Sequence, residues 1–443
     1  MSQVKKKRLF VLSLDGMPFS FAKQAADSGL MPHLARLLVE CDFRQMDSVL
    51  PPVSSSAWAS FLTGMTPAQH GVMGFVHRDP ATMDWFVPRG DALKGETLLK
   101  KLSDQGKTVF SMNVPMTCPP TPVNGVVIAG FLADDLNHAT YPGPIGTLLK
   151  ARGYRIDVDT ELAKKDLTAF VRELHDVLDK RVETMWHFWA QQNWDFFMVH
   201  IMETDRLYHF FWELFQQKHP LYVSLFEEFH RKIDRLIGEI ATRVEQDTAL
   251  LILSDHGFTT LKEEVNVNHW LYRQGLLRFN RMPPQSLKDL HPDTKAYALY
   301  PGRIFINLQG RERTGSVAPG TPYEELRAYL RRALPEIKNG TGQSVIKQVL
   351  NIEELVAQNE DTSRLHQFRP HATLPDLLAI PNEGFDLKGR LWDEKLFDKT
   401  VFNGTHTFHD AFVAAKNLHL PDRRFAINDL FGLIVNFFGS SGF

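Results

Sequence analysis

The segment Leu9-Phe10-Val11-Leu12-Ser13-Leu14-Asp15-Gly16 decides the fold of this chain. Its mostly apolar six-residue run predicts a buried strand, and the Asp-Gly pair is typical of the turn that ends one. A strand without polar alternation is expected inside a parallel sheet that is covered on both faces. An acidic side chain directly after such a strand lies where α/β sheets bind their ligands, at the carboxyl ends of the strands.

Further strands and helices alternate along the chain as a parallel sheet requires. Short apolar runs predict four more strands, at Val109–Asn113, Phe196–Ile201, Ala249–Leu253 and Phe412–Ala414. Apolar residues at three- and four-residue spacing predict covering helices at Met31–Val39, Leu167–Trp189 and Leu221–Val244. We therefore expect an α/β fold, with a mostly parallel central sheet and helices on both of its faces.

One stretch interrupts this alternation. After Phe258 the sequence is richer in Pro, Arg and Lys until about Lys399, although Gly302–Asn307 has the composition of a strand. We interpret residues 259–399 as an inserted smaller subdomain that caps the site or binds substrate. Residues 1–258 plus 400–443 are then expected to form the core domain.

The charge balance and the cysteine content exclude several functional classes. Among 443 residues, 50 Lys and Arg stand against 52 Asp and Glu, so no global field attracts a nucleic-acid polymer. Cys41 and Cys118 are too few for a disulfide framework or a thiolate zinc cluster, and they suit a reducing compartment. No stretch approaches the roughly 18 apolar residues of a membrane span. We expect a cytoplasmic protein.

Two clusters of acidic and imidazole side chains follow predicted strands. Asp255-His256-Gly257 comes directly after one strand, and Asp205 and His209 follow another. Positions i and i+4 share a helix face about 6 Å apart, so Asp205 and His209 can converge on one cation; Thr204 is the expected N-cap of that helix. Asp and neutral His are good ligands for zinc or manganese. Taken alone, each cluster is equally explained by a capped turn or a surface pair.

Two further segments offer chemistry. His406 precedes the last predicted strand, and His409 competes with it for any role. Ser54 follows Pro51-Pro52-Val53 at a predicted helix start, where backbone amides and the helix dipole favour a serine that becomes an alkoxide beside phosphate. An N-cap serine is the alternative, and Ser55 and Ser56 are rival nucleophiles. With Asp15, the clusters supply three Asp, three His and a hydroxyl, about what two divalent cations need.

The order of these residues resembles the alkaline phosphatase superfamily, and within it the type I phosphodiesterase/nucleotide pyrophosphatase group. It is similar there to a branch of predicted prokaryotic phosphohydrolases and phosphomutases. The motifs that carry this resemblance span residues 9 to about 413. They are Pro51-Pro52-Val53-Ser54-x-x-Ala57-Trp58, Asn113-Val114-Pro115-Met116-Thr117, Asp205-Arg206-x-x-His209-Phe210-Phe211-Trp212, Ser254-Asp255-His256-Gly257-Phe258 and Arg303-Ile304-Phe305-Ile306-Asn307.

The resemblance implies an alkaline phosphatase-like sandwich with two divalent metal ions, usually zinc, with manganese in mutase relatives. The ligands it implies are Asp205, His209 and His406 for one ion, and Asp15, Asp255, His256 and the Ser54 oxygen for the other. Ser54 would attack phosphorus and form a phosphoseryl intermediate. The expected protein is a phosphodiesterase or phosphomonoesterase acting on a small phosphorylated substrate.

Two departures from the relatives' motifs narrow the expected substrates. Many nucleotide-cleaving relatives use Thr as nucleophile and keep an Asn about twenty residues later. Here that neighbourhood, His70–Phe75, contains no Asn, so nucleotide specificity is not implied. Sulfatase relatives need x-Pro-x-Arg after the nucleophile, whereas Ser55-Ser56-Ala57-Trp58 follows Ser54. Sulfate ester cleavage by that route is therefore not expected.

Other enzyme motifs fail, and two alternatives stay open. Gly106-Lys107-Thr108 resembles the end of a phosphate-binding loop, but the required earlier Gly is Lys101. The sequence has neither a dinucleotide-binding glycine fingerprint after the first strand nor a serine esterase elbow. A phosphomutase, which must shield its phosphoserine from water, remains an alternative to a hydrolase. A non-catalytic binding protein on the same fold is the alternative from another class.

Substrate contacts are predicted at a few polar residues. Asn113, Arg303 and Arg311 are candidates for binding a phosphoryl group, and His77 for protonating a leaving group. A turn residue, solvated surface charges and a loop histidine are the respective alternatives. Trp58 is expected in the core rather than against a base.

Overall fold

The computed structural model describes residues 6–133, 135–191, 193–356 and 372–439. The chain divides into two compact units. The first comprises Met1–Met65, Arg89–Thr260 and His406–Phe443, and the second comprises Thr66–Pro88 and Leu261–Thr405.

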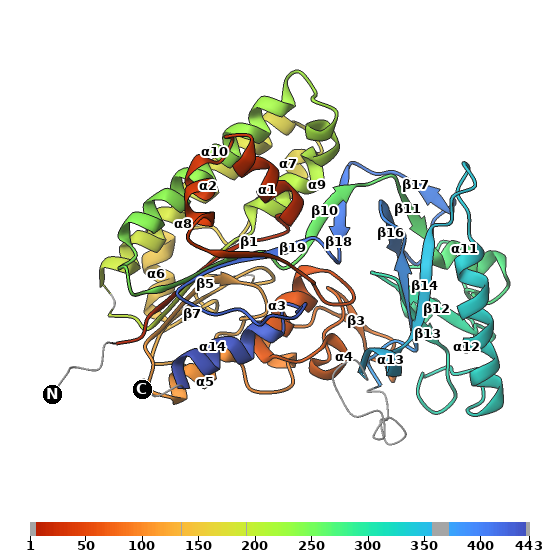
Figure 1. The fold of residues 1–443 in the computed structure, drawn as a ribbon. Coiled ribbons are helices and arrows are strands. Elements are labelled where there is room, and N and C mark those ends of the chain that lie inside the picture. Colours follow the sequence, from red (N-terminus) through yellow and green to blue (C-terminus); the bar gives the residue numbers. More distant parts are fainter. Residues whose placement is uncertain (1–5, 134, 192, 357–371, 440–443) are drawn as a thin grey trace. The chain divides into compact units, whose positions relative to one another are not determined.

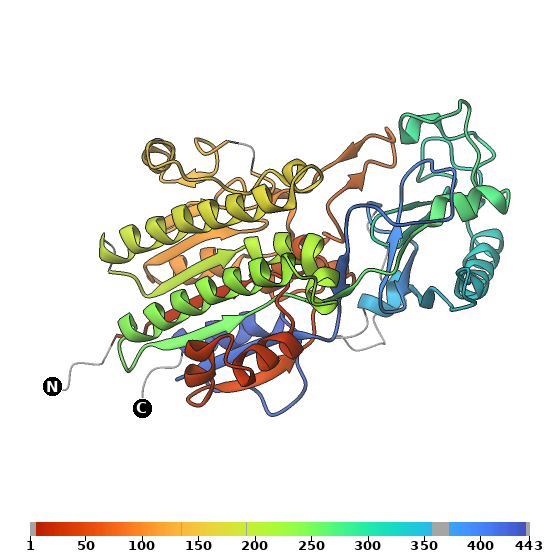
Figure 2. The same cartoon turned by 90° about the horizontal axis from the view of Figure 1, so that it is seen from above.

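The first unit is built on an eight-stranded sheet (Figures 1 and 2). Its strands run in the order β2 (Asp42–Met46), β19 (Ala411–Lys416), β9 (Ala249–Leu253), β1 (Leu9–Leu14), β8 (Phe196–Ile201), β5 (Val109–Val114), β6 (Gly125–Ala129) and β7 (Thr140–Tyr141). The five from β9 to β6 pair in parallel, whereas β19 and β7 are antiparallel to their neighbours. All residues of β1, β5, β8 and β9 are buried, as their mostly apolar composition predicts.

Helices cover both faces of this sheet, as Figure 1 shows. On one face lie α1 (Phe19–Asp27), α2 (Pro32–Leu38), α8 (Leu167–Gln191), α9 (Glu203–Gln216) and α10 (Tyr222–Arg243). On the other lie α3 (Ser54–Thr63), α5 (Leu98–Asp104) and α14 (Asp429–Gly439). Three shorter elements complete this unit, η1 (Gly90–Ala92), α6 (Pro144–Ala151) and α7 (Thr160–Ala163). The predicted α/β fold, with a mostly parallel sheet between two helical layers, is confirmed.

Strand pairing determines what the sheet presents at its carboxyl edge. β1 lies between β8 and β9, with Leu9 opposite both Phe196 and Ala249. The residues that follow these three strands therefore meet at one edge, although they are up to 240 positions apart in the chain. The amide of Asp15 donates to the carbonyl of Ile201 at 3.0 Å, which ties the end of β1 to the end of β8.

The second unit contains smaller sheets. A four-stranded antiparallel sheet has the order β12 (Ala296–Leu299), β13 (Arg303–Ile306), β15 (Leu377–Pro381) and β14 (Ile346–Asn351). A three-stranded sheet has the order β16 (Phe385–Lys388), β11 (Glu263–Asn266) and β17 (Phe397–Asp398). The remaining elements are α4 (Pro67–His70), the hairpin β3 (His77–Arg78) and β4 (Trp85–Phe86), α11 (Val267–Arg273), η2 (Leu287–Asp289), α12 (Thr321–Ala333), η3 (Leu334–Glu336) and α13 (Ile352–Val356). The chain passes between the units in β10 (Gly257–Thr260) and β18 (Gly404–Thr407), which pair with each other.

The observed division differs from the expected one at Thr66–Pro88, which the sequence assigned to the core domain. This segment belongs to the second unit because Arg78 is fully buried there. The Arg78 guanidinium donates to Glu312 at 2.5 Å and to the hydroxyl of Tyr297, and it lies 4.1 Å from the ring centre of Phe305. A single buried arginine leaves no periodicity that would reveal this attachment in the sequence.

In the part of the chain that the structure describes, no helix combines the length and the apolar composition that crossing a membrane requires.

Candidate metal centre and nucleophile

Three buried aspartates converge at the carboxyl edge of the main sheet. Asp15 follows β1, Asp205 lies in the first turn of α9 after β8, and Asp255 follows β9. At most 2% of the surface of each residue is exposed. Burying three carboxylates together is costly unless cations compensate them. The arrangement is therefore that of a site built for positive charge.

One half of this site gathers around Asp15 and Ser54. The Ser54 hydroxyl donates to Asp15 Oδ1 at 3.1 Å and lies 3.3 Å from His256 Nε2. His256 Nε2 in turn lies 3.4 Å from Asp15 Oδ1 and 3.3 Å from Asp255 Oδ2. The amide of Gly16 holds the other oxygen of Asp255 at 3.0 Å. Asp15, Asp255 and His256 together meet the spacing of a metal-binding group.

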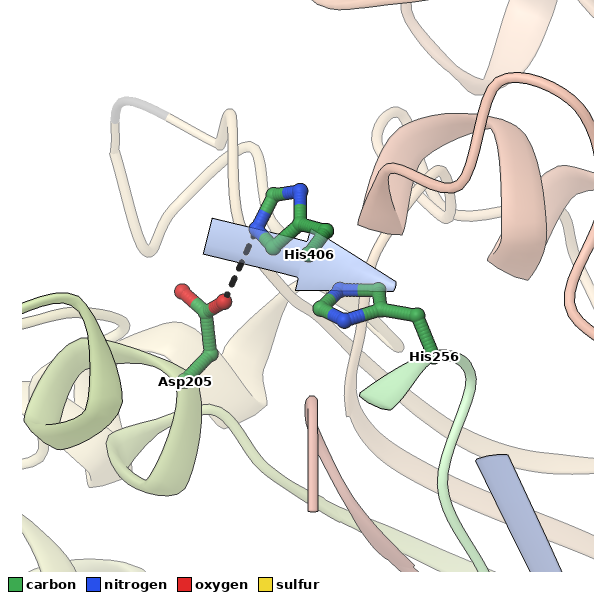
Figure 3. A group of neighbouring side chains, drawn as sticks. All are labelled: Asp205, His256 and His406. Atoms are coloured by element: carbon green, nitrogen blue, oxygen red, sulfur yellow. Dashed lines mark ion pairs between the residues drawn. The ribbon is translucent and has the colours of Figure 1, made fainter. Parts of the chain in front are cut away.

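The other half gathers around Asp205. His209 Nε2 and His406 Nε2 each lie 3.4 Å from Asp205 Oδ1, and the two nitrogens are 3.1 Å apart. Figure 3 shows Asp205, His256 and His406 facing one another, and these three also meet the spacing of a metal-binding group. The rings of His256 and His406 are 4.1 Å apart, so His256 borders both halves.

The structure shows which of the competing serines and histidines lie at the site. The hydroxyls of Ser55 and Ser56 are buried and have no hydrogen-bond partner among the described residues, whereas the Ser54 hydroxyl donates to Asp15. His409 points to the surface, where it contacts Asp47 at 2.9 Å with 55% of its side chain exposed. His406 lies in β18 rather than in a surface loop.

Thr204 does not cap α9. The helix begins one residue before it, at Glu203, with Met202 as N-cap. The Thr204 hydroxyl instead donates to the carbonyl of Asp15 at 2.6 Å, a long-range bond that local sequence cannot reveal. The predicted N-cap is wrong, although the helical spacing of Asp205 and His209 is as expected.

The electrostatics of the cluster follow from burial and from neighbouring charges. Burial and the adjacent Asp15 carboxylate raise the pKa of Asp255 well above its usual range. Burial also raises the pKa of Asp205, but His209, His406 and Arg206 outweigh it and lower the pKa overall. Burial and the neighbouring His406 lower the pKa of His256 to about 4, so this ring is neutral at pH 7 and has a lone pair for a cation.

The residues present fit a divalent metal centre. Asp205 Oδ1 and Asp255 Oδ2 are buried, and neither accepts a hydrogen bond from any described residue. Both oxygens point into the histidine cluster, at the distances given above. Buried carboxylate oxygens without donors, beside imidazole nitrogens, are the ligand atoms that zinc or manganese takes.

Three residues at this site were not predicted. Trp58 Nε1 donates to Asp15 Oδ2 at 3.1 Å, and His200 Nε2 lies 3.0 Å from the same oxygen. Arg206 Nη1 donates to Asp205 Oδ2 at 3.1 Å, and its Nη2 contacts Asp157 at 2.6 Å. A histidine inside the otherwise apolar run Phe196–Ile201 was the available signal for His200.

The predicted substrate contacts have different surroundings. Asn113 is the penultimate residue of β5 in the first unit, and it is fully buried at a φ of 65° that asparagine tolerates. Its Nδ2 has no partner among the described residues, and Tyr154 donates to its Oδ1 at 3.4 Å.

His77, Arg303 and Arg311 belong to the second unit. Arg303 donates to the carbonyls of Val76 and Tyr300, and burial, together with nearby Arg78, lowers its pKa to about 9. Arg311 pairs with Asp376 and Glu312. Burial and neighbouring arginines lower the pKa of His77 to about 3, so this histidine is neutral.

The sequence matches the family model described as type I phosphodiesterase / nucleotide pyrophosphatase over residues 9–409. The chain belongs to this family. Members of the type I phosphodiesterase / nucleotide pyrophosphatase family are metal-dependent phosphoric ester hydrolases of the alkaline phosphatase superfamily. The match extends over both units and includes every residue of the candidate centre.

Solved structures share the fold of this family member. Phosphonoacetate hydrolase from Sinorhizobium meliloti, in complex with phosphonoformate, has a TM-score of 0.64 and 18% identity, over 98% of this chain and 96% of that one. Murine ectonucleotide pyrophosphatase / phosphodiesterase 5 has a TM-score of 0.58 and 13% identity, over 99% and 96%. A comparison with curated proteins finds no match.

Proposed function

We propose that this chain hydrolyses phosphoric diesters or monoesters of small molecules through a phosphoserine on Ser54, with two divalent metal ions. The observation that carries the proposal is the position of the Ser54 hydroxyl. It lies 3.1 Å from Asp15 and 3.3 Å from His256, within the cluster of buried aspartates and histidines. The two ions would be held by Asp205, His209 and His406, and by Asp15, Asp255, His256 and the Ser54 oxygen.

The residues of the chain support each step of this reaction. In the first step Ser54 Oγ releases its proton to water and forms a bond to phosphorus, while the bond from phosphorus to the leaving oxygen breaks and that oxygen takes up a proton from water. In the second step water attacks phosphorus, the bond to Oγ breaks, and Ser54 regains a proton. The ions, when bound, supply positive charge that favours the ionised hydroxyl and stabilises the negative charge that develops on oxygen. Ser54 begins α3, so the positive end of the helix dipole also favours that charge.

Asn113 is the substrate contact that the surroundings favour. Its Nδ2 is a buried donor without a partner at the carboxyl end of β5, which pairs directly with β8, the strand that leads to Asp205. A buried unpaired amide is costly unless a ligand accepts from it, and a phosphoryl oxygen is such an acceptor. Arg303 also has a buried nitrogen, Nη1, without a hydrogen-bond partner among the described residues, but its Nε and Nη2 already donate to backbone carbonyls. His77 is less favoured because it is neutral and buried.

Zinc is the metal that the ligands favour, with manganese as the second choice. The half-site around Asp205 offers two imidazoles and one carboxylate, a typical set for zinc. The half-site around Asp15 offers two carboxylates, one imidazole and a hydroxyl, which also suit manganese. The two free cysteines, Cys41 and Cys118, support the accompanying proposal of a reducing, cytoplasmic compartment.

The test is the variant Ser54→Ala, with Ser56→Ala as matched control on the same helix. We expect turnover of an aryl phosphate diester to fall by at least about 10³-fold in Ser54→Ala, because the nucleophile is lost. Metal content should stay near that of the parent protein. Ser56→Ala should keep its activity, because the Ser56 hydroxyl contacts no polar group among the described residues. Unchanged turnover in Ser54→Ala contradicts the proposal.

A further inference from the structure

The Asp15 carboxylate is held on both of its oxygens. Oδ1 accepts from Ser54 and faces His256, whereas Oδ2 accepts from Trp58 Nε1 at 3.1 Å and lies 3.0 Å from His200 Nε2. All of these side chains are buried, with at most 4% exposed. The two oxygens therefore have different partners: Oδ1 contacts the reacting hydroxyl, and Oδ2 contacts side chains of the protein interior.

The main sheet itself sets the position of His200. Ser13 of β1 and His200 of β8 are directly paired in the register of these parallel strands. Ser13 Oγ lies 3.0 Å from His200 Nδ1, which orients the ring so that Nε2 points at Asp15. A carboxylate oxygen only accepts, so Nε2 carries the hydrogen that faces it. This 3.0 Å contact does not have the geometry of a hydrogen bond, and Nε2 forms no hydrogen bond with any described residue.

Trp58, which lies in the same helix as Ser54, donates a hydrogen bond to Asp15 Oδ2. It lies four residues after Ser54 in α3, so the two side chains project from one face of the helix. Ser54 and Trp58 thus contact opposite oxygens of one carboxylate, and the helix is tied to Asp15 twice. The rings of Trp58 and His200 meet edge-on at 4.8 Å.

We propose that His200 is a positioning residue, which with Trp58 holds Asp15 so that a single oxygen is offered to a cation and to Ser54. Partners that orient a metal-ligating side chain commonly contribute 10- to 100-fold to metal affinity. Without His200 the carboxylate can rotate, and both the bound ion and the Ser54 oxygen lose a fixed neighbour. This role rests on the proposed two-metal hydrolase.

The experiment measures metal binding rather than turnover. Purified full-length parent, His200→Leu and His200→Gln are titrated with zinc and with manganese in competition with a chelator. We expect His200→Leu to bind one of its two ions about 10- to 100-fold more weakly while the other keeps its affinity. His200→Gln should recover most of the loss, because its amide offers a donor at a similar reach. Trp58→Phe should show a smaller loss of the same kind.

His230→Leu is the matched control. His230 is equally buried and also carries two polar contacts, to Tyr208 and to the carbonyl of Phe226, both at 2.8 Å. It should lower the melting temperature with both ions kept at parent affinity. Parent-like binding of both ions in His200→Leu overturns the inference, as does an equal loss in His230→Leu. Ser54→Ala with full activity would instead refute the hydrolytic mechanism and leave these affinities unaffected.

Discussion

Each unit of the chain buries a dense cluster of charges, and the two clusters differ in whether the charges balance. In the second unit Arg78 pairs with Glu312 at 2.5 Å, and Arg311 pairs with Asp376 at 2.7 Å. Tyr323 donates to Asp376 at 2.6 Å, so the acids there have protein donors. In the first unit three aspartates face three histidines, and two carboxylate oxygens accept no hydrogen bond from the described residues.

The comparison shows that burial of charge does not by itself mark a functional site. Both clusters have fully or largely buried carboxylates, and both perturb the pKa values of their members. What distinguishes them is the shortfall of positive charge in the first unit, where Arg206 pairs with Asp205 but Asp15 and Asp255 have no such partner among the described arginines and lysines. Buried carboxylates without a compensating cation are unfavourable. Four experiments would break or sharpen this distinction.

Removal of the metal ions should have the largest effect. A chelator should abolish turnover and lower the melting temperature together, because ions that bind only the folded state stabilise it by about 4 kcal/mol each at 1,000 times their Kd. Hydrogen exchange should accelerate near Asp205 and Asp255 and stay unchanged near Arg78 and Glu312. Full activity after chelation would show that the aspartate–histidine cluster of the first unit needs no cation.

His209→Ala should remove one ion of two. The half-site around Asp205 then keeps one imidazole and one carboxylate, too few for tight zinc binding. Metal analysis should give close to one ion per chain. His409→Ala is the control, because His409 lies on the surface against Asp47. Two ions retained in His209→Ala would make the Asp205–His209 contact structural.

Arg78→Met tests the balanced cluster. Removing one partner leaves Glu312 buried and unpaired, so the free energy of unfolding should fall by about 3–5 kcal/mol. Lys100→Met, which breaks an exposed pair with Asp104, should change it by less than about 1 kcal/mol. Denaturant unfolding of the metal-free proteins measures both. Equal effects would mean that the balanced cluster contributes no more than a surface pair.

The smallest effect is expected from a substitution of His230, a buried histidine that is neutral in the folded protein. Burial lowers the pKa of His230 to about 4, so the folded protein keeps it neutral while the unfolded chain takes up a proton below about pH 6.5. Its contribution to stability is therefore present above pH 6.5 and is lost as the pH falls toward 4, at about 1.4 kcal/mol per pH unit. His230→Gln should reduce the slope of unfolding free energy against pH in that window. An unchanged slope would contradict the neutral buried state.

The sequence by itself determined five of the eight described strands of the main sheet, three of the covering helices and the resemblance to the family. Continuous apolar runs and helical periodicity are local properties, and they located β1, β8 and β9 at the observed residues. The types of ligand were also visible, because Asp and His after strand ends are readable one segment at a time.

The tertiary structure alone decided which of these residues meet. Lateral strand order placed Asp15 between Asp205 and Asp255, and it paired Ser13 with His200, which local periodicity does not encode. The tertiary structure also decided that Ser54 rather than Ser56 contacts Asp15, and that Arg78 is buried in the second unit beside Glu312. The physical reason is that contacts between distant segments depend on how whole elements pack, whereas the sequence pattern reports only how each element buries its own face.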